Sequence, residues 1–255
     1  AINSFADFRV ANHLQDASVT IKSESGYQKS EGSGVLIIRE VDGKKITFVW
    51  TAAHVVDNLR SVREVIDESG RPRKVVEFKD AQIVKELVES GRRVGEIKMD
   101  AAVIKYSNAD TGHDLALLMV HAQDYGKDGA KFYLDQNEPI VPIGTSLFHV
   151  GSLLGQMGAN SMTTGIVSQV GRIMDKMEYD QTTVTAFPGS SGGGVFLTDG
   201  RDMGMLVRGA GEGFNLVVPI RRMITWAKKN DITWAVDHNV KMPALEKIKN
   251  MPVED

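Results

Sequence analysis

The feature that most constrains this chain is the order of three short segments, each of which carries a reactive side chain. In chain order they are Thr51-Ala52-Ala53-His54, Asp114-Leu115-Ala116-Leu117-Leu118 and Phe187-Pro188-Gly189-Ser190-Ser191-Gly192-Gly193. A hydroxyl is a weak nucleophile at neutral pH, so it needs an imidazole to accept its proton and a carboxylate to hold that imidazole in the useful tautomer. The chain supplies one candidate for each role. Its fold has to bring distant segments to one place.

The order of these segments decides between two classes of hydrolase. The stretch Gly189–Gly193 fits the G-x-S-x-G pattern of the α/β-hydrolase nucleophile elbow. That fold places its acid and its histidine after the serine, whereas chymotrypsin-like enzymes have the order His, Asp, Ser. Only His238 follows Ser191, in a polar stretch, and no alternating βαβα pattern surrounds the serine. The order favours the chymotrypsin-like interpretation over the esterase.

Further stretches carry a family resemblance. They are Gly32-Ser33-Gly34-Val35-Leu36-Ile37, Thr51-Ala52-Ala53-His54-Val55-Val56, Thr163-Thr164-Gly165-Ile166-Val167-Ser168-Gln169-Val170-Gly171-Arg172, and Gln181-Thr182 ahead of Pro188-Gly189. In register over residues 30–227, the chain resembles a trypsin-like serine protease, and most closely the protease domain of the HtrA (high-temperature-requirement) family. The resemblance implies an all-β fold of two six-stranded antiparallel β-barrels with a C-terminal helix. It also implies a serine endopeptidase that acts on polypeptides without a cofactor.

Short apolar runs separated by turns agree with an all-β fold. Ser18–Lys22, Gly34–Arg39 and Lys45–Thr51 have the length and pattern of strands, and Asp42-Gly43 is a hairpin turn signal. Apolar residues at helical spacing, followed by cations, predict a helix over Ile220–Lys229. We expect a protease domain over residues 1–230, with its first barrel at about 15–125, its second at about 138–219 and its terminal helix at about 220–230.

The remaining segments are assigned from charge and turn signals. The charged stretch Arg60–Lys74 is predicted to be a surface excursion. We prefer a hairpin to a short amphipathic helix for Ala81–Ser90, with its return strand at Val94–Ile97. Residues 231–255 are expected to form a C-terminal tail that docks on the barrel or on a neighbouring subunit, with a short helix at Ala244–Lys249. Many HtrA relatives carry a PDZ domain after the protease unit, and this tail is too short to form one.

The three predicted catalytic residues have distinct roles. His54 is the predicted general base and Ser191 the nucleophile, because the family register puts the reacting hydroxyl there. Asp114 precedes an apolar strand, which would hold its carboxylate at the edge of the core where it can accept from the imidazole. Asp110 is the alternative for this orienting role. His113 would point to the opposite side of the strand from Asp114, so we interpret it as incidental.

The same loop predicts how an oxyanion would be stabilised and where a substrate side chain would lie. The backbone N–H groups of Gly189 and Ser191 are the predicted oxyanion donors. Two such preorganised groups can lower the activation barrier of acyl transfer by about 3 kcal/mol or more. The predicted pocket walls are Thr185, Ala186, Phe187, Leu206, Val207 and Arg208. Because no acidic residue lies between Gln181 and Ser191, we expect a preference for small or medium-sized apolar side chains before the cleaved bond. An inward-pointing Arg208 would instead favour an acidic side chain.

Composition excludes several other functions. A net charge of -3 with interspersed signs argues against a nucleic-acid partner. No run approaches the roughly 18 apolar residues that would indicate a membrane span, and no metal site is expected because His13, His121 and His149 lack neighbouring ligands in the sequence. The segment Gly209–Gly213 does not match a phosphate-binding loop and is predicted to be a flexible turn. A homo-oligomer remains open.

Two further alternatives stay open at this point. The chain begins with Ala1 and contains no cysteine, so we expect an extracytoplasmic protein if a leader has been removed and a cytoplasmic one otherwise. The alternative to an endopeptidase is a protease-fold peptide-binding module that is inactive or only conditionally active.

Overall fold

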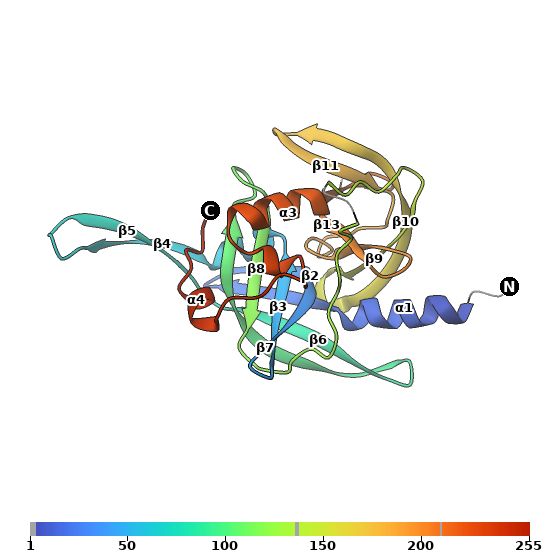
Figure 1. The fold of residues 1–255 in the computed structure, drawn as a ribbon, viewed down its shortest axis with the longest axis horizontal. Coiled ribbons are helices and arrows are strands. Elements are labelled where there is room, and N and C mark those ends of the chain that lie inside the picture. The colour runs from blue at the N-terminus through green and yellow to red at the C-terminus, as the bar shows by residue number, and fades with distance from the viewer. Residues whose placement is uncertain (1–3, 136–137, 210) are drawn as a thin grey trace.

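Two closed β-barrels, each of six antiparallel strands, make up most of the chain (Figure 1). The structure is a computed structural model and describes residues 4–135, 138–209 and 211–255. The predicted fold class, two six-stranded antiparallel barrels followed by a helix, is confirmed.

The first barrel is formed by strands from the N-terminal half. In order around the barrel they are β1 (Ser18–Ser25), β2 (Gln28–Val41), β3 (Lys44–Thr51), β8 (Leu115–Val120), β7 (Arg92–Ser107) and β6 (Ala81–Glu89). Every residue of β8 is buried, because this strand lies between β3 and β7 and its inner side faces the barrel core. The segment that precedes β8 is therefore held firmly at the barrel's edge.

The second barrel is formed by strands from the C-terminal half. In order they are β10 (Gly158–Met174), β11 (Met177–Thr182), β14 (Asn215–Pro219), β13 (Asp202–Gly209), β12 (Gly194–Leu197) and β9 (Ser146–Leu153). Small apolar side chains, among them Val167, Val184 and Val195, fill its core. The loop between β11 and β12 contains the glycine-rich segment singled out in the sequence, and β13 lies directly beside β12.

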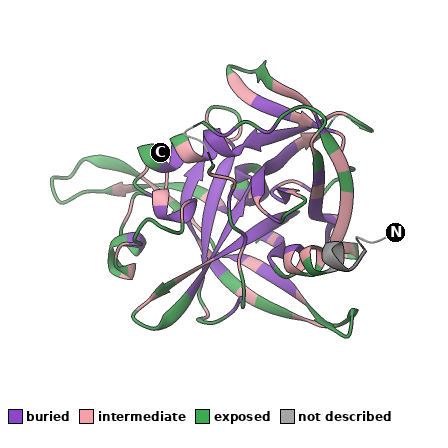
Figure 2. Cartoon of the chain, turned by 45° about the vertical axis from the view of Figure 1, so that its right-hand side comes forward, coloured by how far each residue is buried: buried purple, intermediate pink, exposed green. Residues whose placement is uncertain are grey.

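Two hairpins extend from the first barrel. The predicted pairing of Ala81–Ser90 with the following segment is confirmed, since β6 and β7 are antiparallel partners from Ala81 and Ala101 to Glu89 and Arg92. The predicted surface excursion is itself a hairpin of β4 (Arg60–Ile66) and β5 (Pro72–Phe78), which projects from the molecule (Figure 1). Most of its residues are exposed (Figure 2).

An N-terminal helix, α1 (Ser4–Asp16), was not predicted from the sequence. Its last turn packs against both barrels, because Leu14 shares a small apolar cluster with Val35 of β2, Val150 of β9 and Phe196 of β12. Only this end of the helix makes a fully buried apolar contact, among the side chains described from Arg9 onward. Such a limited apolar face gives a weak helical signal in the sequence.

The C-terminal elements cover the first barrel. The predicted helix is α3 (Ile220–Lys229), and Trp226 in it packs edge to face on Trp50 with 5.8 Å between ring centroids. The tail continues through η3 (Thr233–Ala235) and α4 (Leu245–Lys249), and the Tyr106 N–H donates to Val253 O at 2.8 Å. The tail thus docks on the barrel of its own chain. None of the helices in the described ranges is long and apolar enough to cross a membrane.

Candidate active site

His54 lies in a single helical turn at the end of β3. This turn, α2 (Ala53–Val56), is continued by η1 (Asp57–Leu59). Ala53, Val55 and Val56 are buried in the core of the first barrel, whereas the His54 side chain is 39% exposed. The apolar neighbours therefore anchor the turn and leave the imidazole at the surface of the barrel.

The carboxylate of Asp114 holds this imidazole. Its Oδ2 lies 2.9 Å from His54 Nδ1, and its Oδ1 accepts from the His54 backbone N–H at 3.0 Å. The Asp114 side chain is only 1% exposed, and its backbone has φ +56°, a left-handed conformation that aspartate tolerates better than most residues. Because Nδ1 faces a carboxylate, it carries the proton, which leaves Nε2 as a proton acceptor.

Asp110, the alternative orienting residue, is exposed, and its N–H donates to Asn108 Oδ1. Among the described residues the carboxylate bonded to His54 is that of Asp114. The neighbouring His113 is half-buried, and burial, reinforced by the nearby Arg222, lowers its pKa. The geometry therefore gives Asp114 the contact that the sequence analysis expected of it.

Arg222 of α3 fixes the segment that carries Asp114, and sequence reasoning missed it. Its Nη2 donates to His113 O at 2.9 Å and its Nη1 to Glu178 O at 2.8 Å, while the guanidinium lies 4.8 Å from the centre of the Tyr179 ring. Burial lowers the pKa of Arg222, and the nearby Tyr179 and Asp114 oppose that shift. The one available signal was a pair of arginines in the first turn of an amphipathic helix.

The loop around Ser191 is held by its own turns and by neighbouring strands. Pro188 O accepts from the Leu154 N–H at 2.8 Å, and Ser190 O accepts from the Gly193 N–H at 3.1 Å. In a planar trans peptide the N–H points opposite to the C=O, and no described peptide bond is cis. The N–H groups of Gly189 and Ser191 therefore point away from Leu154 and Gly193 respectively.

Two glycines make this loop conformation possible. Gly189 has φ +98° and Gly192 has φ +88°, values that strain any other residue. A Cβ at Gly189 would also lie 2.4 Å from Ser152 O, and one at Gly192 would lie 2.2 Å from Ser33 O. Both positions thus require glycine for two independent reasons.

The loop packs against the segment that leads to His54. Ser191 O accepts from the Ser33 N–H at 2.8 Å, and a Cβ at Gly192 would lie 3.0 Å from Ala52 N. The Ser191 hydroxyl donates to Val207 O at 3.2 Å. The structure therefore brings the two segments together, but within the described contacts the hydroxyl is bonded to a carbonyl of β13 and not to the imidazole.

A cavity of about 740 Å³ opens beside Ser191. All six predicted wall residues line it: Thr185, Ala186, Phe187, Leu206, Val207 and Arg208. The Arg208 guanidinium is partly turned to other groups, with Nη1 3.4 Å from Asp175 Oδ2 and Nη2 3.5 Å from Ala109 O. Ala210, in the predicted Gly209–Gly213 turn, lies outside the described residues, and Gly209 ends β13.

Comparison with known proteins decides the family. A family model described as a trypsin-like peptidase domain matches residues 32–205. The chain belongs to this family. The resemblance predicted from the motifs is thereby confirmed.

A crystal structure of the serine endoprotease from Yersinia pestis is similar to this trypsin-like chain, with a TM-score of 0.61 and 19% sequence identity. The match covers 89% of this chain and 66% of the other, just under two thirds of its length. At this identity the likeness shows the fold. A search of curated proteins finds no match to the chain.

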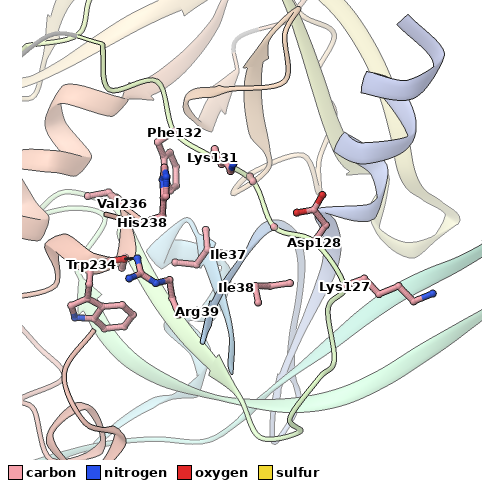
Figure 3. A pocket seen from close by; sticks show the side chains of 13 residues that line it. Ile37, Ile38, Arg39, Lys127, Asp128, Lys131, Phe132, Trp234, Val236 and His238 are labelled. Carbon is pink, nitrogen blue, oxygen red and sulfur yellow. Dashed lines mark hydrogen bonds between the residues drawn. The ribbon is translucent and has the colours of Figure 1, made fainter. Parts of the chain in front are cut away.

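A second cavity, of about 280 Å³, lies on the first barrel of the trypsin-like domain. Its lining contains none of the predicted site residues. Figure 3 shows Arg39, Trp234 and His238 on one side of it and Lys127 and Asp128 on the other. Arg39 donates to the carbonyls of Trp234 at 2.7 Å and of Val240 at 2.6 Å. These bonds attach the C-terminal tail to β2, so this arginine has a structural role.

The three histidines at which no metal site was expected have partners within the protein. His13 Nδ1 lies 3.0 Å from Asp128 Oδ2, and His121 Nε2 lies 2.7 Å from Asp80 Oδ2. His149 of β9 is fully buried, with Nδ1 2.9 Å from Gly194 O, and burial lowers its pKa to about 4. It is therefore neutral at physiological pH, inside the wall of the second barrel.

Proposed function

We propose that this chain is a serine endopeptidase that uses Ser191, His54 and Asp114. The observation that carries the proposal is the buried Asp114 carboxylate bonded to His54 Nδ1, with the Ser191 loop packed against the segment before that histidine. This arrangement fixes the tautomer that a general base needs. Membership of the trypsin-like peptidase family supports the reaction class, hydrolysis of peptide bonds.

In the proposed reaction, Ser191 Oγ attacks the carbonyl carbon of the peptide bond and its proton passes to His54 Nε2. Negative charge then develops on the carbonyl oxygen, which the N–H groups of Gly189 and Ser191 stabilise. The proton moves from His54 to the leaving amine as the C–N bond breaks. Water then attacks the acyl-enzyme, again with His54 as base, and releases Ser191.

Ser191 Oγ is bonded to Val207 O, so in the proposed reaction the hydroxyl has to leave this carbonyl and approach His54. An extended peptide that pairs with the Leu206–Gly209 edge of β13 would offer its own N–H groups to such carbonyls. Substrate binding would then release the hydroxyl.

The pocket supports a preference for a small or medium-sized, uncharged side chain before the cleaved bond. Among its described lining residues, the charged ones are Arg208, part of whose charge is directed toward Asp175, and the exposed Glu212. The sequence alone predicts an apolar side chain at this position, whereas the polar atoms of the pocket would favour an uncharged polar one.

Covalent labelling tests this proposal. The full chain is incubated with a fluorophosphonate, digested and analysed by peptide mass mapping. We expect stoichiometric modification of Ser191, lost in His54→Ala and retained in His121→Ala, a histidine on the exposed surface. A folded chain that remains unlabelled, or one labelled equally well without His54, contradicts the proposal.

The bond from Ser191 to Val207 favours one second candidate, a conditionally active or inactive peptide-binding module. In that case the hydroxyl stays on the carbonyl when peptide is bound. The chain would then bind peptides in the cavity beside Ser191 without cleaving them, and fluorophosphonate labelling would fail in the presence and absence of peptide.

A further inference from the structure

An unpartnered oxygen lies in the wall of the cavity beside Ser191. Asn215, the first residue of β14, lines this cavity and is 1% exposed. Its Nδ2 donates to Val184 O at 2.7 Å, which fixes the orientation of the amide because a carbonyl can face only the NH₂ side. Its Oδ1 is buried and has no hydrogen-bond partner among the described residues. A buried acceptor without a donor is unfavourable, and a donor that reaches it is favoured.

The residue opposite Asn215 is a glycine, which lies close to this buried oxygen. Gly209 of β13 pairs with Asn215 and also lines the cavity. A Cβ at Gly209 would lie 2.3 Å from Asn215 Oδ1. Any larger residue at this position would therefore displace the amide. The pair places an acceptor without a partner in the cavity wall.

The cavity also offers hydroxyl donors. Thr183 Oγ1 accepts from the Ile166 N–H at 2.9 Å, and Ser190 Oγ accepts from the Phe187 N–H at 3.1 Å. Both residues line the cavity. Since a hydroxyl can accept and donate at once, the proton of each remains available to an acceptor on a ligand. The cavity thus combines one fixed acceptor with hydroxyls that can donate.

We propose that Asn215 makes this cavity selective for a substrate side chain that ends in a carboxamide, glutamine above all, at the residue before the cleaved bond. This inference rests on the proposed peptidase function and specifies its substrate. A carboxamide donates through its NH₂ group to Asn215 Oδ1 and accepts from Thr183 or Ser190 through its oxygen.

Other side chains match these atoms less well. A methionine has the length of a glutamine but leaves Asn215 Oδ1 desolvated and unpaired. A glutamate carboxylate only accepts, so its oxygens repel that same oxygen. A lysine donates, but Asn215 carries no charge to balance the ammonium in a buried position.

Matched peptides test the inference on the wild-type chain. Four substrates that differ only at the residue before the cleaved bond carry Gln, Met, Glu or Lys, and kcat/KM is measured for each. We expect Gln to exceed Met by about 10- to 100-fold, the effect of one unsatisfied buried polar group. A ratio of 1 or less, or a preference for Glu or Lys, overturns the inference while leaving the peptidase proposal intact.

Two variants locate the effect. Asn215→Leu has similar volume and lacks the acceptor, so the Gln-to-Met ratio should fall to about 1. Asn239→Leu, at an exposed asparagine of the tail, should keep the wild-type ratio. An unchanged ratio in Asn215→Leu contradicts the inference. Thermal unfolding of both variants checks that they are folded, and the wild-type ratio stands as a test on its own if Asn215→Leu is not.

A binding measurement separates this inference from the reaction itself. Fluorescence anisotropy of Ser191→Ala with labelled peptides compares Gln and Met without any cleavage. We expect the Gln peptide to bind about 10-fold or more tightly. Equal affinities overturn the inference even if the chain is an active peptidase, whereas a Gln preference in a chain that fails to label with fluorophosphonate overturns the peptidase proposal alone.

Discussion

The two barrels contribute to the candidate site in different ways. On the first barrel, the Asp114 carboxylate accepts from both the backbone and the side chain of His54, and Arg222 holds the residue beside it. On the second barrel, the Ser191 hydroxyl is bonded to Val207 O and the Asn215 oxygen is buried without a described partner. On the first barrel the candidate side chains bond to each other, whereas on the second a hydroxyl bonds to a backbone carbonyl and an amide oxygen has no described partner.

This difference indicates which groups of the site need fixed contacts before substrate binds. A general base works through a fixed tautomer and orientation, so its contacts are made before substrate arrives. A nucleophile and a specificity pocket act on the substrate itself, so their polar groups change partners or gain them when substrate binds. Substitutions on the first barrel should therefore reduce turnover for all substrates, whereas those in the pocket should change the choice among them.

The largest expected effect is on kcat/KM, when the catalytic residue of either barrel is removed. Ser191→Ala and His54→Ala should each lower kcat/KM by about 10⁶-fold, and the double variant should be no worse than either, because the two groups act as a unit. Progress curves with a fluorogenic peptide measure this. A double variant that is much worse than each single one would indicate that the serine and the histidine act independently.

The substitution Asp114→Asn should have the next largest effect on turnover. An asparagine of the same shape can present its NH₂ group to Nδ1 and hold the imidazole in the wrong tautomer, so kcat should fall by about 10⁴-fold with little change in KM. Asp110→Asn serves as the matched control, because Asp110 is exposed and lies in the same loop. A comparable loss in the control would move the orienting role to Asp110.

The candidate site was largely predictable because each of its members lies in a local motif. His54 follows an apolar strand, Asp114 precedes one, and Ser191 lies between glycines. The chain order selected the fold. The six wall residues of the pocket followed from their distance in sequence to the nucleophile in the family register.

What the sequence did not predict depends on contacts between distant segments. Arg222 reaches His113 across 109 residues, and the Ser33 hydroxyl donates to Gly189 O across 156 residues. No local pattern encodes such a pair. The role of Asn215 was missed for the same reason, since its meaning depends on Val184 and Gly209, which lie on neighbouring segments only in the folded chain.

Gly189→Ala tests whether the loop of the second barrel is as preorganised as the pair on the first. The added Cβ would meet Ser152 O and strain a φ of +98°, which should displace an oxyanion donor and lower kcat by about 10²- to 10³-fold. Gly26→Ala is the matched control, since Gly26 also has positive φ but has open space around it. It should cost about 1 kcal/mol of stability and leave kcat unchanged. Equal kcat in both variants contradicts the role of Gly189.

Arg222→Met probes the support beneath the first-barrel pair. The methionine fills the space but leaves His113 O and Glu178 O without their donor, so the free energy of unfolding should fall by about 3 kcal/mol. Because the segment before Asp114 loses its attachment, kcat/KM should fall by about 10-fold as well. Urea unfolding and steady-state kinetics measure the two effects. A loss of stability with full activity would restrict Arg222 to a structural role.

The smallest expected effect is a pH dependence of stability caused by a buried histidine of the second barrel. Burial lowers the pKa of His149 to about 4, from an ordinary value of 6.5. Below pH 6.5 the unfolded chain binds a proton at His149 that the folded chain does not bind. The free energy of unfolding therefore decreases as the pH falls from neutral toward 4. Between pH 6.5 and pH 5 the loss should be about 2 kcal/mol.

The variant His149→Gln tests this dependence, because glutamine is neutral at every pH and can donate to Gly194 O. It should remove the loss of stability due to His149, whereas His121→Gln on the exposed surface should keep it. Urea unfolding at both pH values compares the three proteins, and an unchanged slope in His149→Gln would show that the buried imidazole does not set it.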